Sequence, residues 1–127
     1  MKINFLLILT ITLLNANMDV LVSKKSSINN LTKNELSNIY LKKTDEVKGK
    51  KVIVINNKDD YNEFNKKVLN KNSSQIHAYW MKQIFLGRKV PPKSIDKSEV
   101  DSVIKKDPNS VTYTSDKLNE KVIYEVK

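Results

Sequence analysis

The chain has 127 residues, enough for one domain and too few for two well-packed ones. It contains no cysteine, which excludes disulfides, a thiol nucleophile and thiolate metal sites. A formal net charge of +9 would attract polyanions such as nucleic acid. The lysines, however, are scattered among acidic residues, and Asn and Ile are also abundant. This favours compositional bias over a nucleic-acid interface, and we expect no specific nucleic-acid binding.

Residues 1–16 have the pattern of a secretory signal peptide. A basic start, Met1-Lys2, precedes the uncharged stretch from Ile3 to Leu14 and then the small residue Ala16. The stretch is shorter than the roughly 20 apolar residues of a transmembrane helix. We therefore expect cleavage after Ala16, a mature domain over 17–127 that is periplasmic or secreted, and no stable membrane insertion. A retained N-terminal anchor is the alternative.

The next segments predict a strand, a helix and a second strand. Val20–Val22 is a short apolar run typical of a buried strand, and a polar loop follows. Thr32 and Glu35 have the spacing of a capping box, and one helical face then carries Leu36, Ile39 and Tyr40. After a turn around Gly49, the β-branched run Val52–Ile55 is typical of a strand in a parallel sheet. Because a helix separates the two strands, we expect them to be parallel, with a right-handed crossover.

Three more helices and two strands are expected downstream. Asp60 and Glu63 predict a second capping box, Ser73 or Ser74 caps the third helix, and Ser98 caps the fourth, which ends before Pro108. The third helix should bury a stripe of Ile76, Trp80 and Ile84 and end at Gly87. Val111–Tyr113 and the alternating residues Val122, Tyr124 and Val126 predict the last two strands. The order indicates an α/β domain.

Five segments in this order resemble one lobe of the phosphate-type periplasmic substrate-binding proteins of ABC transporters. They are Leu31–Lys43, Val52–Asn57, Tyr61–Leu69, Trp80 and Gly87–Pro92. The resemblance implies a type 2 periplasmic binding fold, here a single lobe with a small, mostly parallel sheet and helices packed on it. The chain resembles in particular the small exported proteins of that superfamily that consist of a single lobe.

The anion motif of that family is missing here. Family members place an Arg and a Ser-Gly-Thr turn at the start of the helix after the strand, where hydroxyls and backbone N–H groups hold phosphate. This chain has Asn57-Lys58-Asp59-Asp60-Tyr61 instead. Its carboxylates suit the helix start but repel phosphate. We therefore predict that phosphate binding in the family's manner is lost.

A small-anion site is expected between two polar loops. In open α/β sheets, ligands lie beyond the carboxyl ends of the strands. The hydroxyl, ammonium and amide groups that follow the first two strands are those of Ser23, Lys24, Lys25, Ser26, Asn56, Asn57 and Lys58. The alternative interpretation is a solvated loop and ordinary turn chemistry.

No pattern in the sequence predicts catalysis, a cofactor or a metal. His77 is the only histidine, and a metal site needs several ligands. The paired acidic residues, such as Asp59 and Asp60, are explained by helix starts. Trp80 fits a core stripe better than a stacking platform for bases or sugars.

We therefore expect a non-enzymatic, exported, substrate-binding-protein-like domain. It would bind a small anion such as phosphate, or a transporter or sensor component, in an uptake or sensing system. The alternative is an interaction module without a small-molecule ligand, which would form a homodimer or act as an adaptor through the face that a lone lobe leaves uncovered.

Overall fold

The computed structural model describes residues 17–127, so the predicted signal peptide lies outside the described residues. The elements are listed here in chain order: β1 (Met18–Val22), α1 (Lys33–Tyr40), β2 (Glu46–Val47), β3 (Lys50–Lys51), β4 (Ile53–Asn57), the 3₁₀ turn η1 (Lys58–Asp60), α2 (Tyr61–Lys67), α3 (Ser73–Phe85), β5 (Lys93–Ile95), the 3₁₀ turn η2 (Lys97–Glu99), α4 (Val100–Lys106), β6 (Ser110–Thr114) and β7 (Lys121–Val126). The α/β class expected from the sequence is confirmed.

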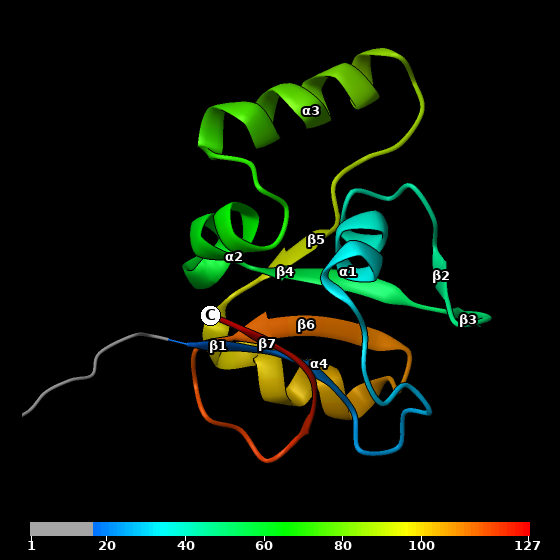
Figure 1. Ribbon diagram of the computed structural model, residues 1–127, viewed down its shortest axis with the longest axis vertical. Coiled ribbons are helices and arrows are strands. Elements are labelled where there is room, and N and C mark those ends of the chain that lie inside the picture. Colours follow the sequence, from blue (N-terminus) through cyan, green and yellow to red (C-terminus); the bar gives the residue numbers. More distant parts are fainter. Residues whose placement is uncertain (1–16) are drawn as a thin grey trace, which may run out of the picture.

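A five-stranded sheet in the order β5-β4-β6-β1-β7 forms the centre of the domain (Figure 1). β4 pairs in parallel with both β5 and β6, whereas β1 pairs antiparallel with both β6 and β7. Four strands thus share one direction and β1 alone runs against them, so the sheet is mostly parallel. A separate two-stranded hairpin, β2–β3, turns through Lys48 and Gly49, both at positive φ, as a type I′ turn requires.

The predicted parallel pairing of the first two major strands is wrong. β6 lies between β1 and β4, and β1 runs antiparallel to both. Strand direction could not be read from the sequence because a strand buried on both faces shows the same apolar run whichever way it points. The carboxyl ends of β1 and β4 therefore lie at opposite ends of the strands of the sheet.

Alternating residues of the strands send their side chains into two cores on opposite faces of the sheet. Val20 and Val54 belong to the larger core, with α1, α2 and α3, whereas their neighbours Leu21 and Ile55 belong to a smaller core with α4. Burial of these side chains is the main stabilising contribution to the fold. The sheet is thus covered by helices on both faces (Figure 1).

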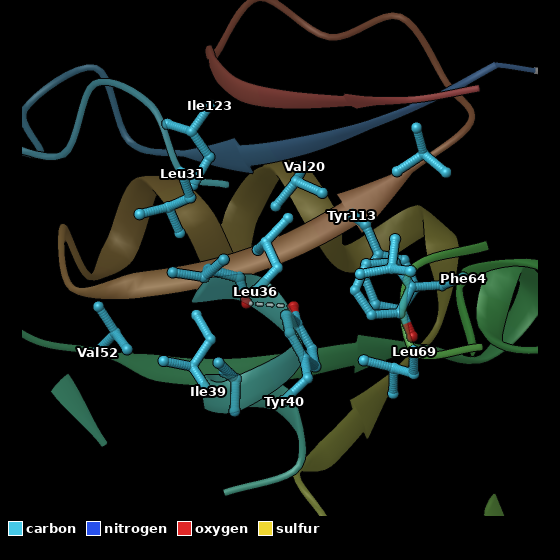
Figure 2. Close-up of a cluster of buried hydrophobic side chains, with 14 of the residues drawn as sticks. Val20, Leu31, Leu36, Ile39, Tyr40, Val52, Phe64, Leu69, Tyr113 and Ile123 are labelled. Carbon is cyan, nitrogen blue, oxygen red and sulfur yellow. Dashed lines mark hydrogen bonds between the residues drawn. The ribbon is translucent and has the colours of Figure 1, made fainter. Parts of the chain in front are cut away.

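Three aromatic rings form the centre of the larger core (Figure 2). Phe64 and Tyr113 stack with ring centroids 3.8 Å apart, and Tyr40 packs against both, 4.7 Å from Phe64 and 5.6 Å from Tyr113. The Tyr40 hydroxyl donates to the carbonyl oxygens of Ile55 (2.9 Å) and Val111 (3.1 Å). Tyr40 therefore fixes α1 across β4 and β6 through both packing and hydrogen bonds.

Capping of the first helix is as predicted, whereas the other three helix starts differ. The Thr32–Glu35 capping box is present. Asp60 makes no capping bond to α2, because its carboxylate is engaged elsewhere. Asn72 with Gln75, rather than Ser73 or Ser74, caps α3, and Asp96 with Glu99, rather than Ser98, forms the box at η2. In the last two cases the residue one or two positions earlier has the extended backbone that an N-cap needs.

Two predicted apolar patterns are only partly buried. In α3, Ile76 and Trp80 are buried as expected, but Ile84 is exposed, and α3 stands away from the sheet (Figure 1). In β7 the buried residues are Ile123 and Val126 rather than Val122, because the pairing with β1 shifts register within the strand. Within residues 17–127, no helix combines the length and apolar character needed to cross a bilayer.

Candidate functional site

The loop after β1 is a tight turn that uses its own hydroxyl groups. Ser23 Oγ accepts from the N–H of Lys25 (3.1 Å), and Ser26 Oγ accepts from the N–H of Ile28 (3.1 Å). Both serines are buried, whereas Lys24 and Lys25 are exposed. Of the four loop residues predicted to bind an anion, only Lys24 and Lys25 therefore present their side chains to the solvent.

Asn56 and Asn57 belong to the buried end of β4 and are used inside the fold. Asn56 Oδ1 accepts from the Tyr113 hydroxyl (2.7 Å), and Asn57 Nδ2 donates to the Tyr113 carbonyl (2.9 Å). Asn57 Oδ1 also accepts from the N–H of Asp59 (3.1 Å). Lys58 is exposed and lies 3.6 Å from a carboxylate oxygen of Asp96. The two amides thus fix β4 to β6 and start η1.

The structure does not bring the two predicted loops together. Leu21 pairs with Thr112, and Val54 pairs with Val111, so the end of β1 lies beside the beginning of β4. The turn from Ser23 to Ser26 and the segment from Asn56 to Lys58 consequently lie beyond opposite ends of the strands. The expectation of one shared site was wrong on this geometric point. Anion binding at either loop separately stays a prediction.

The carboxyl ends of β4, β5 and β6 meet around the carboxylate of Asp60. This carboxylate accepts from the Ser115 N–H (2.9 Å), the Ser115 hydroxyl (3.0 Å) and Asn57 Nδ2 (3.0 Å). Lys97 donates to the Ser115 hydroxyl and lies 3.9 Å from Asp60 and 3.6 Å from Asp116. Only 13% of the Asp60 side chain is exposed. The Asp60 carboxylate thus already accepts hydrogen bonds from the donors that an external anion would need at these strand ends.

A different hollow, of about 650 Å³, opens beside the beginning of β4. The end of α1 and the loop after it form one wall, and the segment that leads into β5 forms the other. We call it the lysine pocket because four of its lining residues are lysines. The lining residues are Ile39, Lys42, Lys43, Thr44, Asp45, Val52, Ile53, Val54, Lys89 and Lys93.

Positive charge dominates the lysine pocket. Its one carboxylate, Asp45, is paired with Lys51 at 3.1 Å, and Lys51 does not line the pocket. Lys42, Lys43, Lys89 and Lys93 form no ion pair with any carboxylate of residues 17–127. Four ammonium groups without counter-charges around one hollow attract anions.

Part of this arrangement is held in place by neighbouring groups. Lys89 Nζ donates to the Lys42 carbonyl (3.0 Å) and lies 5.7 Å from the centre of the Tyr79 ring. The Tyr79 hydroxyl in turn donates to the Leu41 carbonyl (2.7 Å). Lys42 has a φ of 56°, which turns the chain sharply after α1. The two walls of the lysine pocket are therefore fixed to each other.

Sequence reasoning missed the lysine pocket because its lysines lie in two distant segments. The pair Lys42-Lys43 follows α1, whereas Lys89 and Lys93 flank Pro91-Pro92. Lys89 and Lys93 approach Lys42 and Lys43 only because β5 pairs in parallel with β4 and draws the loop after α3 toward α1. The double lysine after a helix was the one local signal.

Two other features of the described region bear on function. No three His, Asp or Glu residues among 17–127 come together as metal ligands.

A second hollow, of about 470 Å³, lies between α2 and α3 and is largely apolar. Tyr61, Asn62, Ser73, Ile76, His77, Trp80, Met81, Ile84 and Pro91 line it.

Comparison with solved structures shows which fold this is. One similar structure is a protein from Clostridium perfringens assigned as a phosphate ABC transporter substrate-binding protein, with bound phosphate. Its TM-score is 0.59 at 15% identity, over 77% of this chain and 39% of that one. A second is an ABC-type phosphate transport receptor from Vibrio cholerae, with a TM-score of 0.52 at 16% identity, over 84% of this chain and 45% of that one. No protein-family model and no curated protein matches the chain.

The chain has a periplasmic-binding-protein-like α/β fold. It spans less than half the length of each of these two structures. The identities of 15% and 16% relate the proteins by fold alone. A shared fold alone assigns neither a ligand nor a role to this chain.

Proposed function

We propose that this protein is an exported, non-enzymatic binding domain of an uptake or sensing system. It binds a small anion in the lysine pocket. The single observation that carries the proposal is the set of four lysines around one hollow, none of them paired with a carboxylate of the described chain. An anion bound there would gain attraction from several ammonium groups and relieve their mutual repulsion. The hollow is also within the size range of small-molecule sites, roughly 300–1,000 Å³.

The region around Asp60, at the carboxyl ends of β4, β5 and β6, supports the same proposal because it is a poor site for an anion. Asp60 uses the two donors of Ser115 and one of Asn57 at the place where a fold of this kind would present donors to a ligand. An incoming phosphate would meet the carboxylate of Asp116, which is 52% exposed, and Lys97 already lies within 4 Å of both Asp60 and Asp116. The lysine pocket is therefore the better anion site.

Calorimetric titration tests the proposal. Phosphate, sulfate and citrate are titrated into the purified protein at constant ionic strength, since salt screens exposed charges. The variant Lys43→Gln/Lys93→Gln removes two pocket charges from exposed side chains. The control Lys24→Gln/Lys25→Gln removes two charges from the predicted loop after β1, where both side chains are also exposed.

We expect at least one anion to bind the wild type and the control with equal affinity, and to bind the pocket variant at least tenfold more weakly. Loss of binding in the Lys24/Lys25 variant alone would move the site to that loop. No heat and no thermal shift with any anion would refute anion binding as the function.

Export is tested by the N-terminus of the protein recovered from the exported fraction. We expect Edman sequencing to begin at Asn17, after removal of residues 1–16. A chain that starts at Met1 and stays with the membrane fraction would support the retained anchor instead.

A second candidate function is self-association through α3, and a specific observation favours it. The end of α3 and the loop after it expose a group of apolar side chains, Met81, Ile84, Phe85, Leu86 and Val90, of which Phe85 is the most exposed at 87%. Exposed apolar patches of this kind mark interaction sites. Light scattering coupled to gel filtration would show a dimer that Phe85→Asp converts to a monomer, whereas a wild-type monomer at high concentration would exclude this function.

A further inference from the structure

The lysine pocket has two chemically different sides. The ammonium groups come from the loop after α1 and from the segment around β5, whereas β4 supplies aliphatic side chains. Ile53, the first residue of β4, is 51% exposed, although the other four residues of that strand are buried. Because Lys93 pairs with Ile55, the side chains of Ile53 and Lys93 lie on the same face of the sheet. An exposed apolar side chain and an unpaired lysine of this hollow therefore share one face.

Size also separates the lysine pocket from a site for an inorganic ion. A phosphate or sulfate ion could contact some of the lysines but would leave much of a hollow of about 650 Å³ filled with water. Ligands that fill sites of this volume usually combine an apolar body with a few polar groups. The lysine stems add further apolar surface around their charged ends.

We infer that the lysine pocket binds an organic anion, with an oxyanion head between the lysines and an apolar tail of a few carbon atoms on Ile53. This inference rests on the proposed function and specifies its ligand class. The lysines supply the attraction for the head. Removal of the tail and of the exposed Ile53 surface from water supplies additional affinity.

A series of phosphate monoesters tests the inference. Inorganic phosphate, methyl phosphate, butyl phosphate and hexyl phosphate share the head and differ in tail length. Burial of each methylene strengthens binding by about fourfold when it is complete, and by less when it is partial. We expect hexyl phosphate to bind the wild type at least tenfold more tightly than methyl phosphate.

Two threonine variants locate the tail. Ile53→Thr keeps a β-branched side chain in β4 and makes it polar, whereas Val122→Thr makes a nearly isosteric polar change in β7, where the side chain is 38% exposed. We expect Ile53→Thr to reduce the ratio of the hexyl phosphate affinity to the methyl phosphate affinity several-fold. Val122→Thr should leave that ratio unchanged. Circular dichroism of each variant verifies the fold.

The outcomes separate the inference from the proposed function. Equal affinities along the series, still lowered by Lys43→Gln/Lys93→Gln, would overturn the inference and leave anion binding in place. A tail gain that Ile53→Thr does not change would also overturn it. No binding by any member would refute both. If Ile53→Thr does not fold, the methyl carbon shifts of Ile53 in the wild-type protein, with hexyl phosphate against methyl phosphate, give the same answer.

Discussion

Replacement of Asp60 by Ala is the sharpest test of the internal carboxylate site. The substitution removes an acceptor that holds the Ser115 N–H, the Ser115 hydroxyl and Asn57 Nδ2 at 2.9–3.0 Å. Hydrogen bonds to a charged group contribute about 1.5–3 kcal/mol each, but contributions within one network do not add fully. Water can also reach part of a side chain that is 13% exposed. We therefore expect Asp60→Ala to lower the free energy of unfolding by about 2–4 kcal/mol.

The assay is urea unfolding followed by Trp80 fluorescence and circular dichroism. Asp59→Ala is the matched control, because it removes the neighbouring carboxylate of η1, which is exposed. We expect it to cost less than about 0.5 kcal/mol, as surface substitutions usually do. Acetate should partly restore the stability of Asp60→Ala and leave the wild type unchanged, because it supplies the missing carboxylate. Equal stability of the two alanine variants would refute the structural role given to Asp60.

Three further predictions concern buried tyrosines, backbone strain and the core. Burial raises the pKa of Tyr40 and Tyr113 above the ordinary value near 10, so above pH 10 the unfolded chain releases protons that the folded chain keeps. The free energy of unfolding should then fall by about 1.4 kcal/mol per pH unit for each tyrosine. Tyr113→Phe should reduce that slope in urea unfolding at alkaline pH, and an unchanged slope would contradict the raised pKa of Tyr113. Lys48→Gly should relieve the positive φ of the hairpin turn, which raises the free energy of unfolding by up to about 1 kcal/mol and also raises the midpoint of thermal unfolding; a lower midpoint would contradict this prediction. Leu36→Ala should cost about 2–5 kcal/mol in urea unfolding because the side chain is fully buried, and a cost below 1 kcal/mol would contradict the packing described for α1.

Local signals in the sequence were sufficient for most elements of this fold. The Thr32–Glu35 capping box, the β-branched run of β4 and the turn at Gly49 depend on neighbouring residues, and the structure shows each of them. Caps were less certain where several cap-forming residues follow one another. Asn72 and Asp96 compete with nearby serines, and only the backbone conformation decides between them.

Strand direction and the candidate site depend on contacts between distant segments. β6 lies between β1 and β4, antiparallel to β1 and parallel to β4. The two strands therefore run in opposite directions, and the loop after β1 lies far from the end of β4. Asp60 looks like a cap in the sequence, but its partner Ser115 is 55 residues away. The lysine pocket likewise joins Lys42 and Lys43 to Lys93 across the β4–β5 pairing.

A nitrogen–proton NMR titration of the wild-type protein with butyl phosphate tests the central claim most directly. We expect the largest amide shifts at the lysine pocket, at Lys42, Lys43, Ile53 and Lys93, and we expect them to saturate together. Saturable shifts centred on Lys24 and Lys25, or on Lys97 and Ser115, would contradict it, as would a spectrum that does not change.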